Sequence, residues 1–125
     1  MPSASSGSPS ADIAFIGGGN MARSLIAGLV RQGIAADTIR VAEPVPALRE
    51  ALAADYGVRA VAAATEAADG APLWVFAVKP QVLRSVCGEL GALATAQRPL
   101  LLSIAAGITA LQLERWLGGA HAVVR

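Results

Sequence analysis

The chain has 125 residues, of which 54% are hydrophobic and 15% are charged, and its formal net charge is +1. Disordered segments are poor in apolar residues and rich in charge, so this composition excludes a chain that is disordered throughout. Nucleic-acid binding requires clustered basic residues, so a net charge this small predicts no nucleic-acid partner. The single cysteine, Cys87, excludes an intrachain disulfide and favours a reducing, cytoplasmic compartment, in which it would be a small buried apolar residue.

The apolar runs and the N-terminal composition set the bounds of the folded part. Runs such as Leu73–Val78 and Leu100–Ile104 are far shorter than the ~20 residues that a membrane span needs, so we expect no membrane partner. Residues 1–11 are mostly Ser, Pro, Gly and Ala and predict a disordered tail. Residues 12–125 then form a single domain.

From residue 12 onward, short apolar runs alternate with stretches whose apolar residues recur at helical spacing. In chain order, the predicted elements are strand Asp12–Ile16, helix Asn20–Gln32, strand Thr38–Ala42, helix Pro44–Tyr56, strand Val58–Val61, a helical turn within Thr65–Asp69, strand Leu73–Val78, helix Gln81–Ala94, strand Leu100–Ile104, helix Leu111–Leu117 and strand Ala122–Val124. In the first helix, Met21, Leu25, Ile26 and Leu29 share one apolar face, and Gly33 is expected to end it.

This alternation predicts an α/β fold of the Rossmann type, in which a doubly wound parallel sheet lies between two layers of helices. Leu73–Val78 is apolar at every position, which is typical of a strand that is covered on both faces. A doubly wound sheet binds its ligands beyond the carboxyl ends of its strands, so the site residues are expected there.

A glycine-rich turn joins the first strand to the first helix. Gly17, Gly19 and Ala22 give it the form G-x-G-x-x-A, in which the backbone approaches the pyrophosphate of a dinucleotide and the next helix offers free N–H groups. The predicted cofactor-binding residues here are Ile16, Gly17, Gly18, Gly19, Asn20 and Met21. We expect Gly17→Val or Gly19→Val to weaken binding and to leave the fold largely intact. The alternative is a glycine turn with a structural role alone.

Glu43 follows the second strand, 24 residues after Gly19. In dinucleotide-binding folds this position lies beside the adenosine ribose, where a carboxylate accepts hydrogen bonds from the 2′-hydroxyl and repels a 2′-phosphate. Glu43 by itself therefore favours NAD over NADP. Two alternatives stay open: Glu43 is a solvated acid in a loop, or a nearby arginine such as Arg40 or Arg49 contacts a phosphate.

The ends of the fourth and fifth strands carry the remaining site residues. Lys79 is the only lysine of the chain, and the proline after it favours an extended backbone. Small residues after the fifth strand leave room for a flat ring. The predicted residues at the two strand ends are Ala77, Val78, Lys79 and Pro80, and Ala105, Ala106 and Gly107. The sequence identifies no catalytic residue and no metal ligands, since its one histidine, His121, has no partner of a suitable kind at ligand spacing.

Four segments together resemble the N-terminal half of pyrroline-5-carboxylate reductase: Phe15–Ala22, Ala77–Gln81, Ser103–Ile108 and Val123–Arg125. The family reduces 1-pyrroline-5-carboxylate to proline with NADPH or NADH. The resemblance implies that the segment at residues 16–21 holds the pyrophosphate, that Glu43 meets the adenosine ribose, and that residues 77–80 and 105–107 line the nicotinamide. It implies NADP as the cofactor, with NAD possible because of Glu43.

Two departures from the family accompany the resemblance. Ala64-Thr65 stand where the family often has an asparagine that touches the cofactor, and the chain stops at Arg125, where the family continues into a helical domain that forms the homo-oligomer and completes the substrate site. We therefore expect the helical domain to be absent and the 125-residue chain alone to be inactive. The alternatives are a dinucleotide-binding module without catalysis, and a domain of another reductase of the β-hydroxyacid dehydrogenase type.

Overall fold

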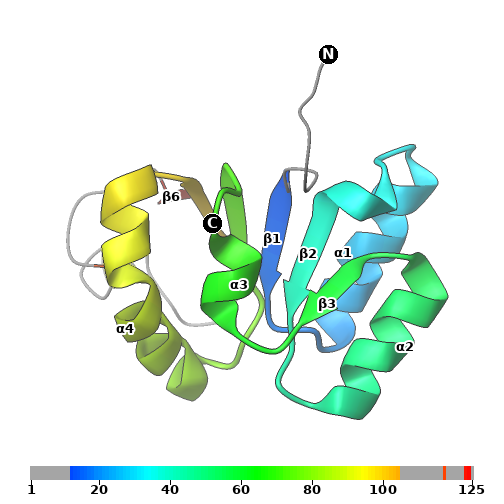
Figure 1. Cartoon of the computed structure of the whole chain (residues 1–125), viewed down its shortest axis with the longest axis horizontal. Coiled ribbons are helices and arrows are strands. Elements are labelled where there is room, and N and C mark those ends of the chain that lie inside the picture. Colours follow the sequence, from blue (N-terminus) through cyan, green and yellow to red (C-terminus); the bar gives the residue numbers. More distant parts are fainter. Residues whose placement is uncertain (1–11, 105–116, 118–122, 125) are drawn as a thin grey trace.

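The computed structural model describes residues 12–104, 117 and 123–124. Its strands are β1 (Ile13–Ile16), β2 (Ile39–Ala42), β3 (Arg59–Val61), β4 (Leu73–Phe76), β5 (Leu100–Ser103) and β6 (Val123–Val124). Its helices are α1 (Asn20–Arg31), α2 (Pro46–Tyr56), α3 (Ala64–Ala68) and α4 (Pro80–Gln97), with a 3-10 turn over Ala36–Thr38 that the sequence did not predict (Figure 1). The predicted tail of residues 1–11, the helix at 111–117 except Leu117, and the site residues Ala105, Ala106 and Gly107 lie outside the described residues.

The six strands form one parallel sheet in the order β3-β2-β1-β4-β5-β6. The chain moves outward from β1 to β3, returns to β4 beside β1, and then moves outward in the other direction. This is the doubly wound sheet that the alternation predicts, with its topological switch between β1 and β4. Ile16 is in register with Ala42 and Phe76, and Phe76 with Ser103, so the carboxyl ends of four strands lie in one row.

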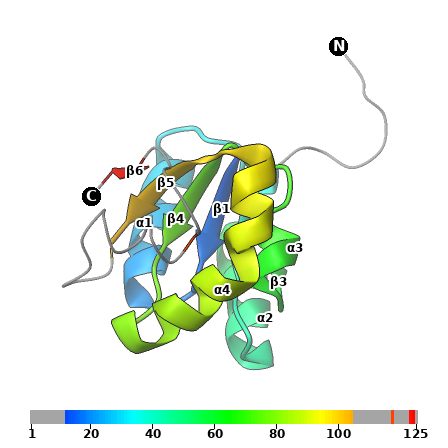
Figure 2. The ribbon, with the colours of Figure 1, turned by 90° about the vertical axis from the view of Figure 1, so that its left-hand side faces the viewer.

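Helices cover both faces of the sheet. α1 and α2 pack on one face around a core that includes Phe15 and Ile26, and α3 and α4 pack on the other around a core that includes Trp74 and Phe76. Figure 2 shows α1 and α4 on opposite sides of the strands. β4 is apolar throughout because Trp74, Val75 and Phe76, which point to alternate faces, are all buried.

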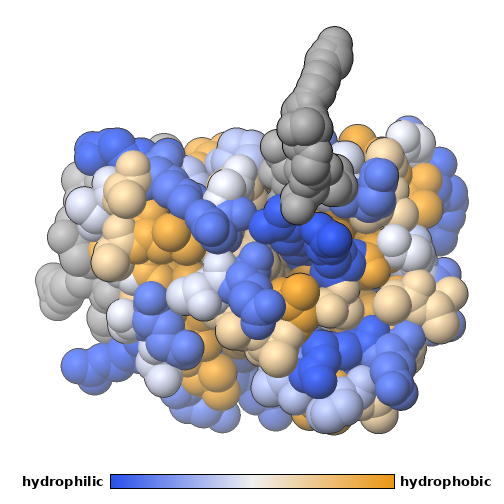
Figure 3. All heavy atoms as spheres, in the orientation of Figure 1, coloured by the Kyte–Doolittle hydropathy of each residue, from blue (hydrophilic) through white to orange (hydrophobic). Residues whose placement is uncertain are grey.

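The surface in the orientation of Figure 1 carries hydrophobic residues in separate small patches between hydrophilic ones (Figure 3). Among the described residues, no helix is long and apolar enough to cross a membrane.

The buried face of α1 is narrower than its apolar residues suggest. Ala22 and Ile26 are fully buried, whereas Met21 is 59% and Leu25 is 40% exposed. Successive residues of a helix are separated by about 100°, so the stripe through Met21 and Leu25 lies on the flank of the stripe that meets the sheet. The apolar spacing gives the helix correctly but does not fix which stripe the sheet covers.

The boundaries of the elements differ from the predicted ones by a few residues. β4 ends at Phe76, two residues before the predicted end, and α4 begins at Pro80 and continues to Gln97, three residues beyond the predicted Ala94. Proline is favoured at the first position of a helix because its missing N–H would have no partner there. α4 therefore starts after a short connection from Phe76 and presents its first turns to the carboxyl edge of the sheet.

Candidate functional site

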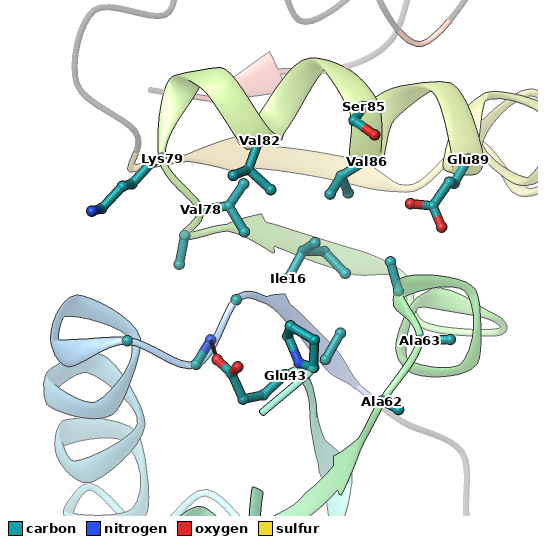
Figure 4. Close-up of a pocket in the computed structure, with 17 residues that line it drawn as sticks. Ile16, Glu43, Ala62, Ala63, Val78, Lys79, Val82, Ser85, Val86 and Glu89 are labelled. Carbon is teal, nitrogen blue, oxygen red and sulfur yellow. Dashed lines mark hydrogen bonds between the residues drawn. The ribbon is translucent and has the colours of Figure 1, made fainter. Parts of the chain in front are cut away.

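A cavity of about 570 Å³ lies at the carboxyl ends of β1, β2 and β4 (Figure 4). This volume is within the range of small-molecule sites, and the place is the switch point at which doubly wound sheets bind their ligands. The residues that line it are Ile16, Gly17, Gly18, Gly19, Ala42, Glu43, Pro44, Ala62, Ala63, Ala64, Ala77, Val78, Lys79, Val82, Ser85, Val86 and Glu89.

The glycine turn is held between two strands by its first residue. The Gly17 N–H donates to the carbonyl of Ala42 (2.9 Å), and the Ala77 N–H donates to the carbonyl of Ile16 (2.8 Å). Gly17 has a φ of +107°, and a Cβ placed on it would lie 2.8 Å from the carbonyl oxygen of Ala77. The tight turn therefore needs glycine at position 17 for its own geometry, whether or not a ligand is present.

Gly19, which lines the same cavity, directly precedes α1, so the free backbone donors of the first turn of the helix lie next to the cavity. Gly19 is the N-cap residue, no side chain caps the helix, and no acidic residue occupies its first turn. The first N–H groups of a helix have no intrahelical partner, and they lie at the positive end of the helix dipole. A Cβ on Gly19 would meet no heavy atom within 4 Å, so the space in front of this backbone is open. This donor set fits a diphosphate group.

Glu43 is buried, with an exposed fraction of 6%, and both of its carboxylate oxygens are used. Oε1 accepts a hydrogen bond from the Gly18 N–H (3.2 Å), and Oε2 accepts one from the Val45 N–H (3.0 Å). The carboxylate thus ties the glycine turn after β1 to the loop after β2, and it still lines the cavity (Figure 4). It is not a solvated loop acid, and its orientation is fixed before any ligand binds.

The two arginines considered for a phosphate contact are engaged with backbone carbonyls. Nη1 of Arg49 donates to the carbonyl oxygens of Glu43 (2.9 Å) and Pro44 (3.0 Å), which braces the loop that carries Glu43. Nη1 of Arg40 donates to the carbonyl oxygens of Glu66 (3.3 Å) and Asp69 (2.9 Å) near α3. Neither arginine lines the cavity.

The predicted site residues divide into three groups. The structure brings together at one cavity Ile16, Gly17, Gly18, Gly19, Glu43, Ala77, Val78 and Lys79. Asn20 and Met21, which begin α1, form the second group and do not line it, and Pro80 begins α4. The third group, residues 105–107, lies outside the described part of the chain.

The wall of the cavity that α4 and the β3–α3 connection provide was not among the site residues predicted from the sequence. Val82, Ser85, Val86 and Glu89 come from α4, Ala62 and Ala63 come from the connection, and Ala64 begins α3. The signal for the α4 residues was present, because positions 82, 86 and 89 share one face of a helix that begins at the edge of the sheet. Whether these side chains face the cavity or the core depends on how α4 packs against the sheet. The sequence of α4 alone does not determine that packing.

Two other kinds of group in the described part of the chain bear on chemistry: the single cysteine and the side chains that could hold a metal. Cys87 is buried in the core between α4 and the sheet, and burial raises the pKa of its thiol to about 12, so the thiolate needed for nucleophilic attack does not form near neutral pH. No group of three or more His, Cys, Asp or Glu within residues 12–104 is arranged to hold a metal. A second hollow of about 360 Å³ lies beside α1, and among the described residues that line it Ser24 and Gln32 are the only polar side chains and none is charged.

Known proteins resemble this chain both in sequence and in fold. A family model described as NADP oxidoreductase, coenzyme F420-dependent, matches residues 12–107. A pyrroline-5-carboxylate reductase of Pseudomonas aeruginosa is 46% identical over 115 residues, which cover 90% of this chain and 41% of the relative. One of Pasteurella multocida is 41% identical over 117 residues, covering 90% of this chain and 42% of the relative.

A solved pyrroline-5-carboxylate reductase structure from Coxiella burnetii superposes with a TM-score of 0.87 at 33% identity and covers 92% of this chain and 43% of that one. The resemblance seen in the sequence is therefore confirmed. The chain spans about two fifths of the length of the relatives that it matches.

Proposed function

This chain belongs to the family described as NADP oxidoreductase, coenzyme F420-dependent, and from that premise we propose that it is the dinucleotide-binding part of a pyrroline-5-carboxylate reductase. The observation that carries the proposal is the cavity in which the glycine turn, the uncapped start of α1 and the fixed Glu43 carboxylate meet. The identity of 46% to the reductase of Pseudomonas aeruginosa supports the choice of reaction.

In this proposal the residues of the chain bind and orient the cofactor. The backbone N–H groups at Gly19 and at the start of α1 hold the pyrophosphate, and Glu43 accepts hydrogen bonds from the adenosine ribose. Ala77, Val78 and Lys79 follow β4 and line the cavity, and in this proposal they would contact the nicotinamide. Bound NADH or NADPH would supply the hydride that reduces the ring C=N bond of pyrroline-5-carboxylate.

The fixed position of Glu43 supports NADH over NADPH. A carboxylate held by two backbone N–H groups cannot swing away from a 2′-phosphate without losing both hydrogen bonds. Because hydrogen bonds to a charged group are worth about 1.5–3 kcal/mol each, movement is costly, and two like charges would face each other. Arg49 and Arg40 already donate hydrogen bonds to backbone carbonyl oxygens, and neither lines the cavity, which also supports NADH.

Calorimetry or the fluorescence of the reduced nicotinamide, with the 125-residue chain and NADH or NADPH, tests the binding part of the proposal. We expect saturable binding of both, with the lower Kd for NADH. A fusion of this chain to the remainder of the Pseudomonas aeruginosa relative tests the reaction, through oxidation of NADH that depends on pyrroline-5-carboxylate. Absence of dinucleotide binding would refute the proposal, and binding without turnover in the fusion would reduce it to a dinucleotide-binding module.

A further inference from the structure

One end of the cavity is an apolar slot along α4. Val82, Val86 and Glu89 recur at the spacing i, i+4, i+7, which places them on one face of the helix. In Figure 4, Val82 and Val86 point into the cavity on the side of Ile16, and Glu89 extends from α4 at the end farthest from Lys79. The slot therefore has apolar walls and a carboxylate at its far end.

The other residues at this end add little polarity. Ala62 and Ala63 line it with methyl groups, which keep the slot open, and Ser85 is the only other residue of this end with a polar side chain in the described part of the chain. Within that part, no hydrogen bond or ion pair engages the Glu89 carboxylate, whereas both oxygens of Glu43 are bonded. Glu89 is thus an exposed hydrogen-bond acceptor at the cavity that has no donor among the described residues.

The order of the groups along a dinucleotide decides which of them reaches this slot. With the pyrophosphate at the glycine turn and the ribose at Glu43, the adenine ring extends away from Lys79 and along α4. The helix rises about 10 Å between Val82 and Glu89, which is enough to flank a fused two-ring base. Apolar side chains then contact the ring faces, and a polar group at the far end meets the edge of the ring.

We infer that Glu89 is a specificity-determining residue that accepts a hydrogen bond from the exocyclic amino group of the adenine base; this inference rests on the proposed dinucleotide binding. An ionised carboxylate only accepts hydrogen bonds, and the 6-amino group of adenine donates them. Hypoxanthine differs from adenine by a carbonyl oxygen at this position. Glu89 would face that oxygen as acceptor against acceptor, and the base would lose the contact.

The test compares the Kd values of NADH and reduced nicotinamide hypoxanthine dinucleotide for the full 125-residue chain, measured by nicotinamide fluorescence. We expect wild type to prefer NADH by about tenfold, the effect of one hydrogen bond to a partly exposed charged group. Glu89→Gln introduces an amide that accepts from an amino group or donates to a carbonyl, so the ratio should fall to about one. Glu50→Gln is the matched control, because Glu50 is an exposed residue of α2 that does not line the cavity.

The outcomes separate this inference from the function on which it rests. A ratio that falls in Glu89→Gln and stays at the wild-type value in Glu50→Gln supports the assignment. A ratio that Glu89→Gln leaves unchanged, or that both variants change equally, overturns the role of Glu89 while dinucleotide binding stands. If wild type binds neither dinucleotide, the proposed function itself fails and this inference fails with it. Circular dichroism of both variants verifies that the fold is retained.

Discussion

Substituting Gly17 and Gly19 by alanine, one at a time, separates the structural role of the glycine turn from its role in binding. The added methyl group would be crowded by neighbouring atoms at position 17 and would face open space at position 19. At Gly17 the backbone has a φ of +107°, and the Cβ would lie 2.8 Å from both the carbonyl oxygen of Ala77 and Cγ1 of Val78. At Gly19 the φ is −76° and the Cβ would meet no heavy atom within 4 Å. We therefore expect Gly17→Ala to act on the fold and Gly19→Ala to act on binding.

The magnitudes follow from these contacts. A non-glycine residue held at an unfavourable positive φ costs about 1–3 kcal/mol, and forcing a methyl group against neighbouring atoms costs about another 1–3 kcal/mol. Gly17→Ala should thus lower the free energy of unfolding by about 2–6 kcal/mol, out of the roughly 5–15 kcal/mol that a domain has. Gly19→Ala should stay within about 1 kcal/mol of wild type, since a weaker N-cap is offset by a less flexible unfolded chain. Its methyl group enters the open side of the cavity and should weaken NADH binding at least about tenfold.

Thermal unfolding followed by circular dichroism measures the first effect, and fluorescence titration with NADH measures the second. We expect Tm to fall by about 10–20 °C in Gly17→Ala and by no more than about 5 °C in Gly19→Ala. This corrects, for position 17, the expectation that valine leaves the fold largely intact, because the clash there is with backbone. For position 19 that expectation stays a prediction. A Tm of Gly17→Ala equal to that of wild type would refute the reasoning from the turn geometry. Unchanged NADH affinity in Gly19→Ala would remove the start of α1 from the binding site.

Two further predictions concern buried groups. Glu43→Ser removes the acceptors of the Gly18 and Val45 N–H groups, so we expect a lower Tm. It also removes the negative charge beside the ribose, so the affinity ratio of NADPH to NADH should rise about 10- to 100-fold. A lower Tm with an unchanged ratio would show that the carboxylate has only a structural role. Burial raises the pKa of the Cys87 thiol from 9.0 to about 12, so the unfolded chain loses this proton at a lower pH than the folded chain does. The contribution of the buried thiol to the free energy of unfolding is therefore complete below pH 9 and should be lost between pH 9 and pH 12. Urea unfolding from pH 8 to pH 11 should show a fall of up to about 1.4 kcal/mol per pH unit that Cys87→Ala lacks, and equal slopes for both proteins would contradict this role of burial.

Local sequence was sufficient wherever the determining physics is local. The alternation of apolar runs and helical spacing gave the order of the described elements and the doubly wound sheet, because both periodicities are properties of consecutive residues. The glycine turn was found for the same reason, since the left-handed φ of Gly17 and the strand-turn-helix context around it are encoded within a few positions. Ligands of doubly wound sheets bind beyond the carboxyl ends of the strands, so Gly19, Glu43 and Lys79 could be predicted to lie near one site before any of their contacts was known. All three line the cavity.

Tertiary structure decided which chemical group each of these residues meets. The Gly18 N–H that Glu43 binds lies 25 residues away along the chain, and this contact exists because β1 and β2 pair in the register that sets Ile16 beside Ala42. Met21 turned out exposed and Val82, Val86 and Glu89 turned out to line the cavity, because the packing of a helix on the sheet selects one stripe of side chains among several of similar polarity. Which stripe of a helix is buried depends on the total of its contacts with residues distant in sequence. A short segment of the chain does not include those residues, so it cannot determine the result.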